Sequence, residues 1–398
     1  RRVTGVAFAY LVAGAVVAGA ANDVLPNLGL PPWTVTLVVV LLLLGFPIAL
    51  VLAWAYEVRP ESKVAEAQDS GAQTRDEETG KPSRSPSDFG HGPMNRIAVL
   101  PFASIHPDRE DDYFADGVTE ELISAISKIK GLDVIARTSV IGCKDSKARI
   151  GEIARDLNVG VVLEGSVRKA GDDLRVTVQL INAETEGHLW AEDYDRKFRE
   201  IFSVQRDIAT HVANALKLQL LTPDAERIGS APTEDLAAFD LYLLGRHHLN
   251  RRSDAGTRRA ISSFERAVEL DGSFAPASAG LADAFLLAAL GYLTAPPGNA
   301  LELAREKARH AIQLDESLSE AHTSLGYAAL LAWDLRTAES ELRQAIEINP
   351  SYAQAHQWMA QVLIWLDRAE DGIKEYERAL ELDPLSPILT LEMGWGYH

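Results

Sequence analysis

The sequence predicts a multidomain chain with three structured parts: a two-helix transmembrane hairpin, an α/β domain and an all-α solenoid of helical repeats. Three observations predict this order. Two long apolar runs without a charged residue stand at the start, strand and helix patterns alternate in the middle, and a 34-residue period runs through the last part. At about 150 residues per domain, 398 residues are enough for two or three such units.

The composition excludes several classes of protein. Hydrophobic residues make up 47% and charged residues 24%, which is ordinary for globular protein and excludes wholesale disorder. The single cysteine, Cys143, excludes a disulfide framework and any cysteine-based zinc or iron–sulfur site. The formal net charge is −18, and residues 222–398 alone carry 27 acids against 15 bases. We therefore expect no nucleic-acid partner, because duplex binding depends on clustered Lys and Arg.

The predicted membrane hairpin covers residues 1–58. Its spans lie at about 3–21 and 33–56, and each reaches the about 20 residues that a helix needs to cross the hydrocarbon core. The loop between them, DVLPNLGLPP, contains three prolines and one acid. The alternative for the first run is a cleaved signal peptide, but a second span follows at once. We therefore expect an integral membrane protein.

The charges beside the spans predict the orientation. Arg1 and Arg2 precede the first span, and Arg59 and Lys63 follow the second. The positive-inside rule then places both ends of the hairpin in the cytoplasm. A periplasmic placement stays open, because only a few charges decide it. Residues 59–95 are rich in Ser, Pro, Gly, Glu and Asp, so we expect a disordered linker there.

Residues 96–221 show the alternation of an α/β domain. Short apolar runs indicate strands, and apolar residues at helical spacing indicate helices. The segment KAGDD between two strand patterns is typical of a hairpin turn. The expected strands are 96–102, 132–136, 159–167, 174–181 and 188–194, and the expected helices are 114–129, 150–157 and 198–221.

Four stretches of this domain resemble the TolB-like amino-terminal domain: RIAVLPF, YFADGVTEELISAISKI, VVLEGSVRKAGDDLRVTVQLINAETEGHLWAEDYDR and IFSVQRDIATHVANAL. The resemblance extends to the hairpin and implies a protein of the bacterial inner membrane in which helical repeats follow the module. This module also occurs beside class III cyclase or winged-helix domains. The resemblance implies no catalytic residue. The propeller of TolB itself is absent from the pattern, so TolB's own function is not transferred.

Residues 236–398 form the predicted repeat array. At a period of 34, Ala311, Ala345 and Ala379 align, and so do Pro350 and Pro384. Small residues at these offsets are typical of the tetratricopeptide repeat, a helix–turn–helix unit that must stack to bury its apolar faces. Two looser copies precede two regular ones. A fifth copy is cut off by the end of the chain, so we expect the array to be truncated at its carboxyl end.

The first helix of each repeat lines the binding groove in this family, and it supplies the candidate site. The carboxylate clamp of chaperone-type repeats is excluded, because it needs Lys, Arg and Asn at these positions. An apolar and amide-rich groove suits a helix or an extended peptide. For Tyr327 and Trp365 the alternative is packing between repeats alone. The expected groove residues are Glu320, Thr323, Tyr327, Leu330, Gln354, Gln357, Gln361, Ile364 and Trp365.

We find no catalytic, cofactor or metal motif in the sequence. There is no G-x-S-x-G, H-E-x-x-H, phosphate loop or kinase set. His247 and His248 are adjacent, so on a helix they diverge by about 100° and cannot share a metal. Glu192, Asp193 and Asp195 cluster on one strand and could bind a cation, although exposed acids at a strand end are the commoner interpretation.

The sequence therefore predicts a membrane-anchored, non-enzymatic scaffold or adaptor. Its partners are expected to be proteins or peptides bound in the repeat groove, and self-association into a homo-oligomer is a further state that such arrays permit. The alternative is a sensory or regulatory signalling protein in which the TolB-like module binds a small ligand or an envelope signal. No cofactor is expected in either case.

Overall fold

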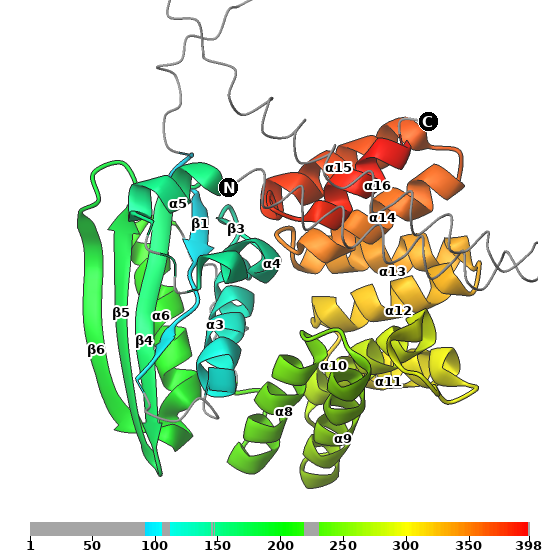
Figure 1. Ribbon diagram of the computed structural model, residues 1–398, viewed down its shortest axis with the longest axis horizontal. Coiled ribbons are helices and arrows are strands. Elements are labelled where there is room, and N and C mark those ends of the chain that lie inside the picture. The colour runs from blue at the N-terminus through cyan, green and yellow to red at the C-terminus, as the bar shows by residue number, and fades with distance from the viewer. Residues whose placement is uncertain (1–91, 106–111, 145, 147, 219–230, 397–398) are drawn as a thin grey trace, which may run out of the picture. The chain divides into compact units, whose positions relative to one another are not determined.

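The computed structural model describes residues 92–105, 112–144, 146, 148–218 and 231–396 (Figure 1). They belong to the compact unit Ser83–His398. The predicted transmembrane hairpin and nearly all of the linker lie outside the described residues. Within the described part, Ala275–Tyr292 is the one helical stretch long and apolar enough to span a membrane, but 61% of it is buried inside the protein. We therefore interpret it as a core helix of the repeat array.

A mixed sheet organises the α/β domain. Strand β1 pairs in parallel with β3 and β4, whereas β4, β5 and β6 form an antiparallel meander. The sheet order is β3-β1-β4-β5-β6, and the short β2 pairs with β4. The strands are β1 (Arg96–Val99), β2 (Ala103–Ser104), β3 (Asp133–Val134), β4 (Val161–Ala170), β5 (Asp173–Asn182) and β6 (His188–Lys197). The predicted hairpin between β4 and β5 is present, with Gly171 in the left-handed region (φ 61°) that its tight turn requires.

Alternation along β1 shows that helices cover both faces of the sheet. Ile97 and Val99 belong to the main core with α3 and α6, whereas Ala98 and Leu100 belong to a smaller core with α4 and α5. The helices are α3 (Asp112–Ser127), α4 (Arg137–Val140), α5 (Ile150–Asp156) and α6 (Ile201–Ala215), with 3₁₀ turns at Ile141–Cys143 and Phe198–Glu200.

The rest of the described chain is a TPR-like solenoid of helix pairs. The first helices of the pairs are α8 (Leu236–Leu249), α10 (Ala275–Leu287), α12 (Ser319–Leu331), α14 (Ala353–Trp365) and α16 (Pro387–Gly396). The second helices are α9 (Asp254–Leu270), α11 (Ala300–Leu314), α13 (Leu335–Ile348) and α15 (Ala369–Leu382), and a π-helical segment, Ala288–Tyr292, extends α10.

In each of two helix pairs, a buried histidine at the same repeat position joins the first helix to the second. Nδ1 of His322 lies 2.8 Å from a carboxylate oxygen of Glu341, and its Nε2 lies 3.1 Å from the carbonyl oxygen of Glu316. His356 repeats this arrangement with Glu375 and the carbonyl of Pro350. Each ring thus links a first helix to the second helix of its pair and to the turn that precedes the first helix. The spacing of these histidines is therefore architectural.

Two glycines leave room for one aromatic ring that packs between the helices of the first two pairs. A Cβ added at Gly245 or at Gly280 would lie 2.6 Å from the ring of the fully buried Phe264. We expect Gly280→Val to lower the free energy of unfolding by about 1–3 kcal/mol, because the interior is close-packed and the ring cannot move aside. Urea unfolding followed by circular dichroism measures this. Gly272→Val is the control, since its added Cβ meets nothing nearer than 3.9 Å. Equal midpoints for the two variants would contradict the expectation.

Candidate functional site

Helix α3 of the α/β domain packs against α8, the first helix of the array. Glu120 on α3 accepts hydrogen bonds from Nε of Arg246 on α8 at 3.0 Å and from Nδ2 of Asn250 at 3.1 Å. The next residue, Glu121, accepts a hydrogen bond from the hydroxyl of Tyr242 at 2.9 Å. Tyr242, Arg246 and Asn250 recur every four residues, so one face of α8 meets α3.

The contact continues onto the third helix pair. Ser124, one turn after Glu120, donates a hydrogen bond to Oε1 of Glu320 on α12 at 3.2 Å. Glu320 is one of the predicted groove residues, and the structure places it against the chain's own α3. Side chains of α8 and α12 therefore already form hydrogen bonds with a helix of the same chain.

The interface is rich in buried carboxylates. Burial raises the pKa of Glu121 to about 7, although the Tyr242 hydroxyl and the Arg246 charge oppose this. Burial also raises the pKa of Asp283, on α10, to about 6. Burial acts in the same direction on Glu120, but the charges of Arg246 and of a second arginine, Arg137, hold the pKa of Glu120 below its ordinary value. Arg246 is thus the central cation of this interface.

The turn that precedes α14 and the carboxyl-terminal half of α15 cover the β3 edge of the sheet. Ser351 donates a hydrogen bond to the carbonyl of Leu132 at 3.0 Å, and Arg378 contacts the carboxylate of Asp133 at 3.1 Å. The backbone N–H of Ala136 donates to the carbonyl of Leu382 at 2.8 Å. The α/β domain therefore contacts the described array from α8 to the end of α15.

Beyond α3, the groove positions of α14 and α16 carry different chemistry. At the register positions of Glu320 and Thr323, α14 carries Gln354 and Gln357, and α16 carries Ile388 and Leu391. Nε2 of Gln357 donates to a carboxylate oxygen of Glu392 at 2.9 Å. The apolar side chains of Ile388 and Leu391 are 44% and 55% exposed. We call Gln354, Gln357, Gln361, Ile388 and Leu391 the open groove.

The structure places other predicted groove residues either in the core or in one of two aromatic pairs. Thr323 and Leu330 are buried within the array. Tyr327 stacks on Trp358 of the next first helix, with ring centroids 3.8 Å apart, which is packing between repeats. Trp365 stacks on Trp333 at 4.8 Å. Trp333 was not among the predicted groove residues, although a tryptophan in a turn between two helices is a signal in the sequence.

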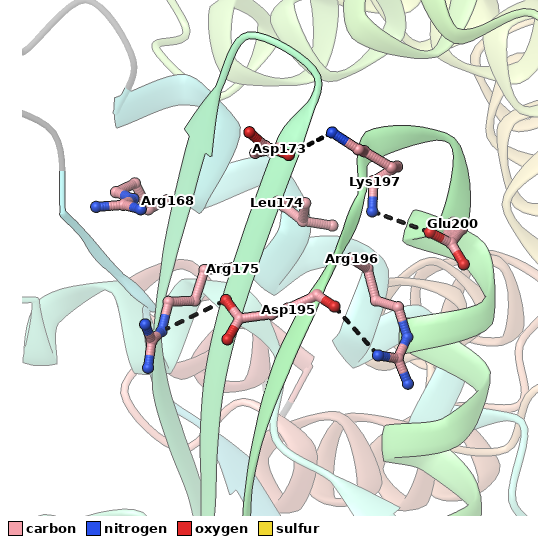
Figure 2. Close-up of a pocket in the computed structure, with 8 residues that line it drawn as sticks. All are labelled: Arg168, Asp173, Leu174, Arg175, Asp195, Arg196, Lys197 and Glu200. Carbon is pink, nitrogen blue, oxygen red and sulfur yellow. Dashed lines mark hydrogen bonds and ion pairs between the residues drawn. The ribbon is translucent and has the colours of Figure 1, made fainter.

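A separate cavity of about 400 Å³ lies at the turn end of β4, β5 and β6 (Figure 2). Its charged groups are largely paired with one another. Nζ of Lys197 lies 2.6 Å from a carboxylate oxygen of Asp173, and the backbone N–H of Lys197 donates to Glu200 at 2.9 Å. The cavity is lined by Arg168, Asp173, Leu174, Arg175, Asp195, Arg196, Lys197 and Glu200.

The acidic cluster on β6 does not converge on one point. Asp193 and Asp195 lie 3.6 Å and 3.8 Å from guanidinium nitrogens of Arg175, whereas Glu192 lies beside His211. Successive residues of a strand point to opposite faces, which separates Glu192 from the other two. Among the residues that the structure describes, no group of three or more His, Cys, Asp or Glu side chains is placed to hold a metal ion.

The fold and this interface define a class of protein: an α/β module docked on the groove side of a TPR-like helical array. Residues 94–211 match the family described as HilA/YgeH-like transcriptional regulator, second domain. A protein of Rhizobium meliloti (strain 1021) named "Putative adenylate cyclase 3" is 37% identical over 245 residues, which cover 62% of this chain and 41% of that protein. The chain thus spans about two fifths of the length of this relative.

Several solved structures of TPR proteins are similar to the chain at low identity. A thermophilic TPR protein of Thermus thermophilus is 18% identical, covers 50% of this chain and 95% of its own, and has a TM-score of 0.34. YrrB, described as a TPR protein with an unusual peptide-binding site, is 16% identical, covers 50% and 90% of the two chains, and has a TM-score of 0.30.

Proposed function

We propose that this chain is a membrane-anchored, non-enzymatic scaffold or adaptor that binds a protein partner in the open groove. The observation that supports this is the change of surface along the first helices. Helix α3 contacts α8 and α12, whereas Ile388 and Leu391 are exposed on α16, the last described helix, which Gln357 of α14 joins through Glu392. Exposed apolar side chains beside polar ones are typical of an interaction surface. A helix or peptide with apolar side chains fits it.

The remaining parts of the proposal concern the module and its location. We propose that residues 96–221 are a TolB-like module and that residues 1–58 anchor the chain in a bacterial inner membrane. The soluble parts then lie in the cytoplasm, with the periplasm as the alternative. The partners are proteins or peptides rather than nucleic acid, and a homo-oligomer is one further arrangement.

A second candidate function is sensing or regulation. The names of the matching family and of the curated relative, a transcriptional regulator and an adenylate cyclase, favour it. In this alternative the module binds a small ligand or an envelope signal, and α3 transmits the effect because it contacts both the sheet core and the array. A ligand-dependent rise in the melting temperature of the full chain is expected. An unchanged melting temperature with every nucleotide and cell-wall fragment tested would count against this function.

The open groove is tested by replacing its exposed apolar side chains with charged ones. We expect Ile388→Arg with Leu391→Arg to reduce recovery of the partner at least about tenfold, because two charges replace apolar contacts that would be buried on binding. The measurement is a quantitative pull-down with the full chain from a detergent extract of the encoding bacterium.

The matched control changes two exposed leucines outside the open groove. Leu270 and Leu314 end α9 and α11 and are similarly exposed, so Leu270→Arg with Leu314→Arg alters net charge and apolar area in the same way. This control should retain the partner. Identical recovery by both double variants would exclude the open groove as the binding surface.

A further inference from the structure

Two tryptophans form an exposed stacked pair on the array. Trp333 lies in the turn between α12 and α13, and Trp365 is the last residue of α14. Their rings are nearly parallel, with centroids 4.8 Å apart and an interplanar angle of 12°. Trp333 is 72% exposed and Trp365 is 44% exposed. Indole surface therefore faces solvent next to an ordered second ring.

The repeat fold does not require tryptophan in this turn. The register positions of Trp333 in the first and fourth copies carry Arg252 and Asp367, and all three residues have positive φ, at 60°, 42° and 60° respectively. The left-handed backbone does not favour a bulky side chain, and a ring so exposed contributes little to the core. A role outside the packing of the array accounts for it better.

The charges nearby favour a cationic occupant. The turns that carry the tryptophans also carry Asp367 and Asp334, although the carboxylate of Asp334 accepts a hydrogen bond from the backbone N–H of Thr337 at 3.2 Å and lies near Arg305. The nearby Arg368 is already engaged, since its guanidinium nitrogens lie 2.7 Å from Glu339 and 3.2 Å from Asp371. Residues 222–398 as a whole carry 12 more acids than bases. This charge repels an anionic lipid surface and attracts a basic segment.

Tryptophan is the aromatic side chain that binds cations best, and a planar guanidinium stacks on its face. We propose that the Trp333–Trp365 pair is a docking site for an arginine side chain on a basic segment of a partner protein. This site is distinct from the open groove as defined above, because neither tryptophan is among its five residues, although Trp365 was predicted to lie beside the groove.

The test uses the full chain in detergent and a fluorescein-labelled octa-arginine peptide as the probe. Fluorescence anisotropy at about 150 mM salt, where surface charge is screened beyond about 8 Å, should show binding that weakens about five- to tenfold in Trp333→Ala with Trp365→Ala. Octa-lysine, with equal charge, should bind wild-type protein more weakly than octa-arginine, and the double variant should remove that difference. Trp333→Phe with Trp365→Phe should restore part of the affinity, which separates loss of rings from loss of fold.

Three outcomes would overturn the proposal. The first is unchanged octa-arginine affinity in the alanine variant, which would assign the binding to net charge alone. The second is binding to phosphatidylglycerol vesicles that depends on the two tryptophans, which would indicate a lipid surface. The third is concentration-dependent self-association lost in the same variant, which would indicate a second copy of this chain. Leu270→Ala with Leu314→Ala serves as the control for exposed apolar area.

Discussion

Replacing Arg246 with alanine is expected to loosen the α/β module from the array and to lower the free energy of unfolding by about 3–5 kcal/mol. Arg246 on α8 contacts Glu120 of α3 and lies 3.6 Å from a carboxylate oxygen of Asp283 on α10. The variant would leave these carboxylates buried without their central cation. Urea unfolding measures the loss, and a separate, earlier transition for one part of the chain would show undocking.

The control for this prediction is an exposed arginine that also has two carboxylate partners. Arg368 contacts Glu339 and Asp371 at the surface. Solvent and salt screen such pairs, so Arg368→Ala should leave the unfolding midpoint nearly unchanged. Arg246→Met combined with Glu120→Gln should recover part of the stability lost in Arg246→Met alone, because the buried charge is removed with its partner. Equal midpoints for the Arg246 and Arg368 variants would contradict the central role of Arg246.

Local patterns were sufficient to predict much of the fold. Leu174, Val176, Val178 and Leu180 alternate with polar residues, and the structure buries these four on one face of β5. The 34-residue period predicted the helix pairs of the array that the structure contains. Both signals are local, since side-chain periodicity depends on the helix or strand itself.

The docking of α3 could not be predicted in the same way. Glu120 and Glu121 lie in the middle of α3, where acidic residues are also typical of a solvated helix face. The partner of Glu120, Arg246, is 126 residues away and has the sequence context of a surface charge. Pairing across such a distance leaves no periodic signal in a single sequence. The predicted groove therefore included Glu320, although its carboxylate already bonds to Ser124.

The same interface predicts an unusual dependence of stability on pH. We expect the free energy of unfolding to fall as pH rises from about 5 to 8. Glu121 and Asp283 have pKa values raised by burial to about 7 and about 6, so the folded chain holds protons that the unfolded chain releases at lower pH. Stability therefore falls between the unfolded and the folded pKa of each group.

A buried histidine acts in the same direction. Burial tends to lower the pKa of His322, but its bonds to Glu341 and to the Glu316 carbonyl raise it above its ordinary value. Its contribution is complete below a pH of about 6.5 and is lost as pH rises through the folded pKa. Glu120 and Asp133 have lowered pKa values, so their stabilising contribution is complete above about pH 4 and is lost only as pH falls below that. Maximal stability is therefore expected near a pH of about 5.

The Glu121→Gln variant distinguishes the contribution of this interface to the pH dependence of stability from that of the rest of the chain. The groups that face Glu121 are Tyr242 and Arg246 from α8 and Glu120 and Lys128 from the α3 segment. The amide cannot ionise, so the variant should lose about 3 kcal/mol less stability than wild type between about pH 5 and 8. Urea midpoints across this range measure the slope, with Glu265→Gln, an exposed position on α9, as the control. A slope that is the same in Glu121→Gln, or stability that rises with pH, would show that Glu121 is ionised in the docked state. The contact between α3 and α8 would then have to tolerate a second buried negative charge, which Arg246 alone is poorly placed to offset because it already binds Glu120.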